Sequence, residues 1–343
     1  MLTENRASPQ VRQRWRDEVS AAVRDPAVLW RRLRLPRLLL PAGRRAAEAF
    51  PLRVPEPLLR RIRPGDPDDP ILRQVLPQGA ELETVPGFTT DPLREAAQCA
   101  GTGLLRKYAG RCLVVTTGAC AVHCRYCFRR HFPYAEETNR RRTPPPLPGD
   151  VEEVIFSGGD PLMLDDEVLE ARLAQATAHP TVRRLRLHTR MPVAVPSRVT
   201  ERLLKIVAAC PLPMVVVIHA NHPAEIDDDV AEALTALKSA AAAVLNQSVL
   251  LRGVNDDAGT LAALSRRLFD AGVLPYYLHL LDPVAGAAHF QVDEDVARRL
   301  MAEAAARLPG YLVPRLVREE PGAPAKTVIA PATAGATGEA TGI

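Results

Sequence analysis

From Cys112 onward, short runs of aliphatic and β-branched residues alternate with longer segments in which apolar residues recur at helical spacing. Apolar strands that alternate with helices predict a parallel sheet covered by helices. The predicted strands are Cys112–Thr117, Glu153–Ser157, Arg184–His188, Met214–His219, Ala243–Val249 and Tyr276–Leu280. The predicted helices are Asp165–Ala178, Ser197–Ala209, Asp227–Ala240, Ala258–Ala271 and Asp293–Arg307.

This alternation predicts an α/β fold in which about six parallel strands form an open or incomplete βα barrel. A flatter doubly wound sheet is the alternative. In both architectures the working residues lie at the carboxyl ends of the strands. The segments that directly follow the predicted strands are therefore the places to look for chemistry.

The start of the chain has a different pattern, with few strand signals and with prolines that interrupt its helical segments. Those segments include Gln13–Leu29 and Asp91–Leu105. We predict a helical N-terminal region over residues 1–105 and the α/β core over residues 106–329. The last residues, 330–343, have a low-complexity sequence and are predicted to be disordered.

Composition and charge narrow the class of protein. Hydrophobic residues make up 47% and charged residues 24% of the 343 residues, which is an ordinary globular composition. The formal net charge of +4 is too small to indicate a nucleic-acid partner. The N-terminus carries charges where a signal peptide needs an apolar stretch, and the run Leu38–Pro41 is far shorter than the ~20 residues that span a bilayer. We therefore expect a cytoplasmic protein that binds neither nucleic acid nor membrane.

Three of the six cysteines lie within eight residues, in the loop that follows the first predicted strand. They are Cys120, Cys124 and Cys127, with the spacing C-x3-C-x2-C. In a reducing compartment such a group indicates metal or redox chemistry rather than disulfides. Three thiolates on a 4Fe–4S cluster leave one iron open, and Tyr126 before the third cysteine favours this interpretation. A zinc site completed by His123 or His131, or three unrelated core cysteines, are the alternatives.

Polar residues also follow other predicted strands. The second strand ends in Ser157-Gly158-Gly159-Asp160, where glycines let backbone approach a ligand closely, although an ordinary tight turn explains them equally well. His219 and Gln247 end the fourth and fifth strands, and a single histidine there is more often structural than a ligand.

Lysine is rare, so any chemistry that needs an amine has few candidates. The four lysines are Lys107, Lys205, Lys238 and Lys326. Two of them fall on predicted helix surfaces and Lys107 precedes the first strand. Lys326, in a Pro/Gly-rich loop, is by elimination the best amine for a Schiff base, although a loop lysine is usually only solvated.

The C-x3-C-x2-C pattern with its aromatic residue resembles the signature of the radical S-adenosylmethionine (SAM) superfamily. The longer string CAVHCRYCFRRHFPY, residues 120–134, resembles the lysine 2,3-aminomutase family, and most of all its bacterial elongation factor P branch. The resemblance runs in order from about residue 90 to 327. It includes IFSGGDPL (155–162), RLRLHTRMP (184–192), IHANHP (218–223), LNQSVLLRGVND (245–256), PYYLHLLDPVAGAAHF (275–290) and YLVPRLVREEPGAPAKT (311–327).

The resemblance implies three cofactors, with residues for each. A 4Fe–4S cluster would be bound by Cys120, Cys124 and Cys127. SAM would contact Ser157, Gly158, Gly159, Asp160, His219 and Gln247. Pyridoxal 5′-phosphate (PLP) would form a Schiff base with Lys326, and Arg111 and Arg125 would lie near its phosphate. For both arginines a solvated side chain is the alternative.

The substrate residues follow from the same resemblance. Arg129 matches an arginine that pairs with the substrate α-carboxylate, a task that suits the planar guanidinium group. Asp282 and Glu319 match two acids that hold the substrate ε-ammonium, although catabolic members have aspartate where this chain has Glu319. Two acids at this place favour a cationic substrate over a glutamate-like one.

The implied activity is conversion of L-α-lysine to β-lysine, with reduced flavodoxin or ferredoxin as electron donor. Catabolic members carry a further C-terminal cysteine cluster that binds zinc, and this chain has no cysteine after Cys210. This difference favours the elongation factor P branch, in which a ligase would transfer β-lysine to the factor. A catabolic or other amino-acid 2,3-aminomutase is the first alternative, and a non-catalytic iron–sulfur or zinc-binding protein is the second.

Overall fold

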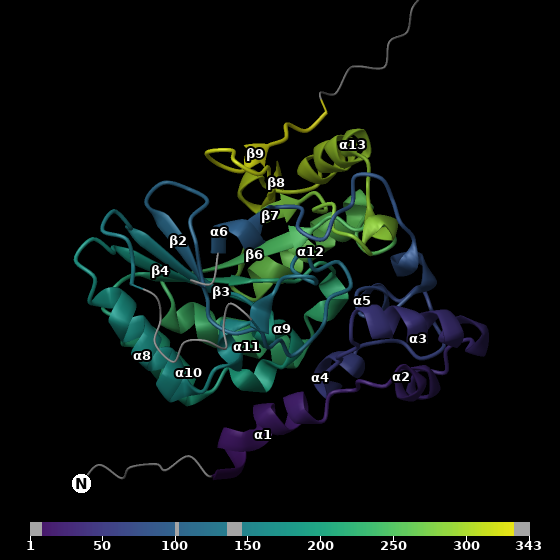
Figure 1. Cartoon of the computed structure of the whole chain (residues 1–343), viewed down its shortest axis with the longest axis horizontal. Helices are drawn as coiled ribbons and strands as arrows, with labels where there is room; N and C mark the ends of the chain where they lie inside the picture. Colours follow the sequence, from purple (N-terminus) through teal and green to yellow (C-terminus); the bar gives the residue numbers. More distant parts are fainter. Residues whose placement is uncertain (1–8, 100–102, 136–145, 333–343) are drawn as a thin grey trace, which may run out of the picture.

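The computed structural model describes residues 9–99, 103–135 and 146–332, which contain one nine-stranded sheet (Figure 1). The strands are β1 (Leu104–Leu105), β2 (Arg111–Val115), β3 (Glu153–Ser157), β4 (Arg184–Thr189), β5 (Met214–Ile218), β6 (Ala243–Val249), β7 (Leu274–His279), β8 (Arg315–Arg318) and β9 (Thr327–Val328). Strands β2 to β8 are all parallel, whereas β1 and β9 pair antiparallel at the two edges. The six predicted strands are confirmed as β2 to β7.

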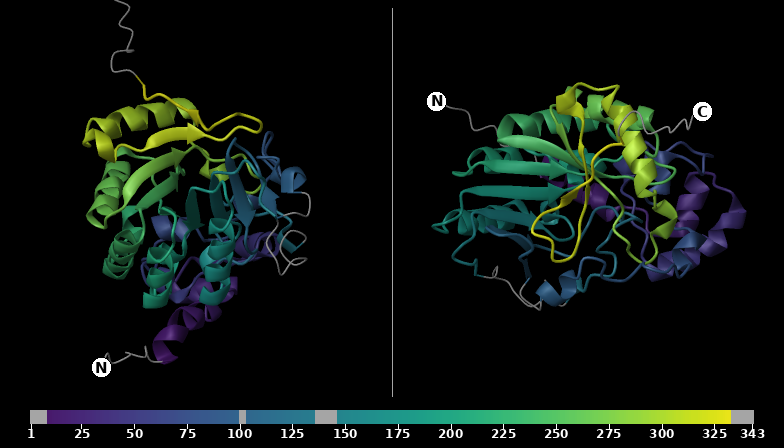
Figure 2. Two further views of the ribbon diagram at one scale, coloured as in Figure 1. Left: turned by 90° about the vertical axis from the view of Figure 1, so that its left-hand side faces the viewer. Right: turned by 90° about the horizontal axis from the view of Figure 1, so that it is seen from above.

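The strands lie in the sheet in chain order, from β1 to β9. A doubly wound sheet would reverse its order at a switch point, so this alternative is excluded. The two edge strands do not pair with each other, and the curved sheet is therefore an open barrel, as predicted (Figure 2). Strand β8, a seventh parallel strand, was missed because it has four residues and an arginine at each end.

Helices cover the outer, convex face of the sheet (Figure 2). They are α8 (Asp166–Thr177), the short α9 (Met191–Ala194), α10 (Glu201–Ala208), α11 (Asp228–Ala240), α12 (Ala258–Asp270) and α13 (Glu294–Ala305). Three of them begin at a residue whose side chain accepts a hydrogen bond from the first turn, namely Thr200, Asp227 and Asp257. The five long helices match the predicted ones closely.

The N-terminal region is made of short helices that lie beside the carboxyl ends of the strands (Figure 1). They are α1 (Pro9–Ser20), α2 (Pro26–Arg32), α3 (Leu40–Ala49), α4 (Glu56–Leu59), α5 (Pro70–Arg73) and α6 (Glu95–Cys99). The predicted helix Gln13–Leu29 is wrong, because the chain breaks between α1 and α2. There Val23 exchanges two backbone hydrogen bonds with Val54, of 2.8 and 3.0 Å, and Asp25 caps the next helix.

Two other predicted segments differ from the structure or lie partly outside it. The segment Asp91–Leu105 contains α6 and then β1, not one helix. Of the predicted disordered tail, residues 333–343 lie outside the described residues. No helix in the described ranges is long and apolar enough to cross a membrane.

A buried carboxylate joins the N-terminal region to the loop that carries the three cysteines. Glu81 forms ion pairs with Arg125, at 2.5 Å, and with Arg130, at 2.7 Å, and all three side chains are almost fully buried. Arg125 also donates to the backbone carbonyls of Phe50, at 2.7 Å, and Ala46, at 3.2 Å. The loop is therefore held by long-range charge pairing from a region more than forty residues earlier.

Removing the charge of Glu81 should strongly destabilise the protein. In Glu81→Gln two buried guanidinium groups lose their counter-ion, and breaking a buried pair typically costs about 3–5 kcal/mol. We expect the free energy of unfolding, measured by urea denaturation, to fall by about 3 kcal/mol or more. The control is Glu170→Gln, which removes the exposed pair of Glu170 with Arg202 and should cost less than about 1 kcal/mol. Equal losses in the two variants would contradict the structural role of Glu81.

Candidate active site

The loop after β2 brings the three cysteines together. Cys120, Cys124 and Cys127 are free thiols, and they lie close enough that Cys124 and Cys127 help to raise the pKa of Cys120. Burial, aided by Cys124, raises the pKa of Cys127 to about 11. Within the described ranges no His, Cys, Asp or Glu group converges as the ligands of a single ion do. A cluster of several irons accepts wider spacing, because each thiolate binds a different iron.

The glycine-rich turn after β3 packs directly against this loop. A Cβ atom on Gly159 would lie 2.3 Å from the carbonyl oxygen of Ala119, so only glycine fits there. The amide of Gly159 donates to Thr117, and that of Asp160 to Ala119. Gly158 has a φ of 121°, a conformation that favours glycine. The turn therefore sets the position of the cysteine loop, whatever ligand it contacts.

The carboxylate of Asp160 is committed to protein donors. It accepts hydrogen bonds from the Thr189 hydroxyl, at 2.7 Å, and from the amides of Arg190 and Leu162. Burial nevertheless raises the pKa of Asp160 to about 6. These hydrogen bonds join the ends of β3 and β4. Because the Asp160 side chain is occupied, the predicted contact with SAM would have to come from backbone groups of the turn.

A buried arginine touches one of the cysteines. Arg190 donates to Cys124 Sγ and to the hydroxyl of Tyr126, the latter at 2.8 Å, while its other nitrogen pairs with Glu225 at 2.8 Å. Gln74 accepts a further bond at 2.8 Å. The contact places a positive charge directly beside Cys124 Sγ. The string RLRLHTRMP contains Arg190, but no local feature of the sequence shows that it reaches a cysteine.

The predicted pair His219 and Gln247 meet at the carboxyl ends of β5 and β6. The Gln247 amide lies 3.1 Å from Nε2 of His219. Burial, followed by the nearby Arg190 charge, lowers the pKa of His219 to about 3, so the ring is neutral at physiological pH. A neutral imidazole and an amide can both donate to and accept from a polar ligand.

A chain of alternating charges crosses the same end of the barrel. Glu319, just after β8, pairs with Lys326 and also with Lys107, at 2.8 Å. Lys107 pairs in turn with Glu95 at 2.6 Å, and Glu95 holds Arg129 through two hydrogen bonds of 2.6 and 2.9 Å. Three distant segments of the chain therefore contribute to one network, which contains Lys326, Arg129 and Glu319.

Asp282, the other predicted acid, lies near this network but makes no ion pair in the described part of the chain. Burial, followed by the negative charge of Glu319, raises the pKa of Asp282 to about 7, although Lys326 and Lys107 oppose this shift. An acid with a raised pKa gains most from a new cation beside it. Asp282 is thus the site residue best prepared to receive a positively charged group.

The structure does not place every predicted residue in this network. Arg125 faces the N-terminal region, and its guanidinium group is occupied by Glu81 and by carbonyls, so the predicted phosphate contact does not fit this geometry. Arg111 begins β2, is exposed, and lies with its guanidinium carbon 5.5 Å from the Tyr108 ring centre. Ser157 accepts a 3.2 Å hydrogen bond from Arg129.

Two residues of the network were not assigned to the site from the sequence. Lys107 was set aside because it precedes the first strand, yet it shares Glu319 with Lys326. Glu95 carries no motif, and only its contacts with Lys107 and Arg129 reveal it.

Two orphaned histidine nitrogens provide a test of whether the site fits a polar cofactor. Nε2 of His188 and Nε2 of His279 are buried without a hydrogen-bond partner in the described ranges. The His279 ring packs edge-on against Tyr277, and the Lys326 amine lies 5.8 Å from the centre of the same tyrosine ring. The His188 ring packs against His219. Unpartnered buried polar atoms are rare in proteins. An amine with free polar groups around it suits a cofactor such as PLP.

The raised pKa of Asp282 predicts a pH-dependent penalty on stability. The folded protein retains this proton up to about pH 7, whereas an unfolded aspartate loses it near pH 4. As the pH rises from 4 to 7, the free energy of unfolding of the wild type should therefore fall relative to that of Asp282→Asn. We expect a relative change of about 3 kcal/mol, measured by urea unfolding of cofactor-free protein. If the free energies of unfolding of the two proteins change in parallel with pH, the pKa of Asp282 is not raised in the folded protein.

Known proteins resemble the chain over almost its whole length. The L-lysine 2,3-aminomutase of Escherichia coli (strain K12) is 48% identical over 325 residues, which cover 92% of this chain and 94% of that protein. The L-lysine 2,3-aminomutase of Haemophilus influenzae is 43% identical over 324 residues, covering 93% and 96%. A scan against models of protein families finds no match.

Solved structures add only a remote likeness. A radical SAM methyltransferase from Sphaerobacter thermophilus is 16% identical, covers 63% of this chain and 68% of its own, and has a TM-score of 0.40, which is too low to support an argument. The end-to-end sequence similarity is decisive by itself. The chain belongs to the lysine 2,3-aminomutase family.

Proposed function

We propose that the protein is a radical SAM, PLP-dependent isomerase that converts L-α-lysine to β-lysine. The observation that carries this proposal is the pair of acids in the charge network. Glu319 already binds the ε-ammonium of a lysine side chain, that of Lys326, and Asp282 lies beside it without a cation of its own. Arg129 stands at the other end of the same network, where a carboxylate can bind.

When bound, the 4Fe–4S cluster and SAM supply a hydrogen-abstracting radical, and PLP stabilises the substrate while its amino group moves from C2 to C3. Cys120, Cys124 and Cys127 would hold the cluster, and Lys326 would carry PLP. The backbone of Gly158 and Gly159, with His219 and Gln247, would contact SAM. The task of the chain is to hold these groups in one orientation away from water.

The charge network gives each substrate group a partner. Glu319 has two cationic partners in the ligand-free protein, Lys107 and Lys326, and with Lys326 drawn towards the cofactor it would accept the substrate ε-ammonium together with Asp282. Arg129 keeps its orientation through Glu95 and uses its remaining N–H groups for the substrate α-carboxylate. Arg111 is the remaining candidate for the cofactor phosphate, since Arg125 is occupied elsewhere.

The elongation factor P branch is the more specific part of the proposal. The chain matches the two reported relatives nearly end to end, and it has no cysteine after Cys210 to form the C-terminal zinc site of catabolic members. The β-lysine would then pass to a ligase that modifies the factor. The alternative of a non-catalytic metal-binding protein gives no reason for an amine, two acids and an arginine to share one network.

The lysine that carries PLP can be identified directly. Lys326 and Lys107 share Glu319, so both are candidates by position. We expect borohydride reduction of the PLP-loaded protein, followed by peptide mapping, to find the label on Lys326. In Lys326→Ala the label and the PLP absorbance should be lost while the iron content stays unchanged. A label on Lys107 would overturn the assignment of Lys326.

The activity and its charge selectivity can be tested together. Reconstituted protein with lysine, SAM, PLP and dithionite should form β-lysine, whose configuration chiral chromatography would define. Norleucine lacks the ammonium group and should be a poor substrate. In Asp282→Asn the ratio of kcat/KM for lysine over norleucine should fall by roughly 30-fold or more, because loss of one charged partner typically costs about 2–5 kcal/mol. An unchanged ratio would remove the acids from substrate selection.

A further inference from the structure

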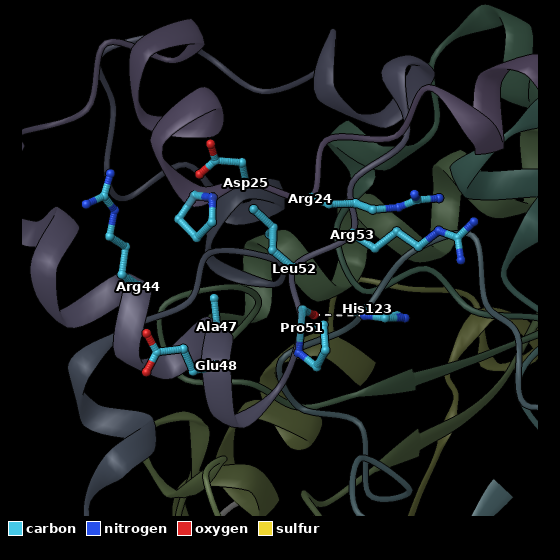
Figure 3. A pocket seen from close by; sticks show the side chains of 10 residues that line it. Arg24, Asp25, Arg44, Ala47, Glu48, Pro51, Leu52, Arg53 and His123 are labelled. Atoms are coloured by element: carbon cyan, nitrogen blue, oxygen red, sulfur yellow. Dashed lines mark hydrogen bonds between the residues drawn. The ribbon is translucent and has the colours of Figure 1, made fainter. Parts of the chain in front are cut away.

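A surface cavity of about 450 Å³ lies between the N-terminal helices and the cysteine loop (Figure 3). Arg24, Arg44, Arg53 and His123 line it, together with the less polar Pro51 and Leu52. No residue of the charge network contributes to its wall. The cavity is therefore a different site from the one that would bind lysine.

The floor of this cavity belongs to the cysteine loop itself. His123 is the residue before Cys124, and its ring stacks on Phe50 with centroids 5.3 Å apart. Its Nδ1 lies 2.8 Å from the carbonyl oxygen of Pro51, and its amide donates to the carbonyl of Arg53 at 3.1 Å. The Arg53 guanidinium group lies close enough to Cys120 for their charges to interact. One residue of the cavity wall, His123, is therefore the direct neighbour in sequence of Cys124, a proposed cluster ligand.

The cavity carries positive charge that the protein does not neutralise. In the described part of the chain none of Arg24, Arg44 and Arg53 forms an ion pair. Arg53 is half-buried beside Arg24, and its Nε has no hydrogen-bond partner. Two acids, Asp25 and Glu48, also lie on the wall, so the three arginines exceed the carboxylates by one charge, and neither acid forms an ion pair in the described part of the chain. A half-buried cation without a counter-ion is unfavourable, and an anionic partner would relieve it.

We propose that this cavity is the docking surface for an acidic electron-transfer protein that reduces the cluster. The inference rests on the proposed function, because radical formation consumes one electron that the chain cannot supply. In the step, one electron passes from a reduced flavin or iron–sulfur carrier to the oxidised cluster, and the carrier is oxidised by one electron. Carboxylates around the carrier's prosthetic group would meet the three arginines, and complementary charge would speed the encounter.

The test compares a protein reductant with a small one. In reconstituted holoenzyme, cluster reduction is followed by visible absorbance and by electron paramagnetic resonance, with reduced flavodoxin or with dithionite. The variant carries Arg24→Glu and Arg44→Glu, which leaves Arg53 and the cysteine loop intact. Its matched control carries Arg266→Glu and Arg299→Glu, which make the same change in net charge on α12 and α13.

At low ionic strength the rate with flavodoxin should fall roughly tenfold or more in the cavity variant and by less than about twofold in the control. The rate with dithionite should be unchanged in both. An unchanged flavodoxin rate in the cavity variant, or an equal loss in the control, overturns the proposal. If the cavity variant is also reduced slowly by dithionite, the salt dependence of flavodoxin reduction is measured in the wild type instead. A rate that falls steeply with salt supports the proposal, and a rate that does not depend on salt overturns it.

Failure of this proposal is distinguishable from failure of the proposed function. β-Lysine formation with dithionite needs no docking protein. If wild type and cavity variant both form β-lysine with dithionite while flavodoxin shows no preference for the cavity, only the docking surface is wrong.

Discussion

The buried carboxylate of Glu81 is the constraint on which the position of the cysteine loop depends. It neutralises Arg125 and Arg130, two cations that the loop itself contributes on either side of Cys127. Without it, the loop would have to expose both guanidinium groups or bury them unpaired, and the second choice costs several kcal/mol. The pairing also fixes where the side chains of the loop point: Arg125 and Arg130 point to Glu81, whereas Arg129 points to Glu95 and to Ser157 at the end of β3.

From this anchor, the rest of the site is built by contacts between turns that follow neighbouring strands. The glycine-rich turn after β3 lies against the loop after β2 because no side chain stands between them at Gly159. Asp160 then joins that turn to the end of β4, and Arg190, at the end of β4, returns to Cys124. These contacts surround one thiol of the loop with polar partners before any cofactor binds. Such preorganisation reduces the reorganisation that cofactor binding requires.

The charge network differs from the Glu81 ion pairs because a ligand could replace one of its cations. Lys326 holds Glu319 in the ligand-free protein, and the same carboxylate is the proposed partner of the substrate ammonium. Lys107 also pairs with Glu319, so this carboxylate would keep one cation if Lys326 moved away. The pKa of Asp282 is raised in the ligand-free protein. A cation that binds beside Asp282 would lower this pKa and favour the ionised carboxylate. In the proposed function, selectivity for a cationic substrate would come from Asp282, the acid of this group that has no ion pair in the described part of the chain.

Local sequence patterns were enough to predict the elements whose formation depends on neighbouring residues. Hydrophobic runs identified six parallel strands and their helices, cysteine spacing indicated the loop that is proposed to hold the cluster, and the motif resemblance identified the family. The parts that the sequence could not determine depend on partners distant in the chain. The break between α1 and α2 comes from pairing of Val23 with Val54. Strand β8 is too short to show a period and forms only because β7 offers an edge. Whether a charged side chain faces a cofactor or a counter-ion is decided by charge compensation across tens to hundreds of residues. Tertiary structure alone therefore assigned Arg125 to Glu81 and brought Lys107 and Glu95 into the site.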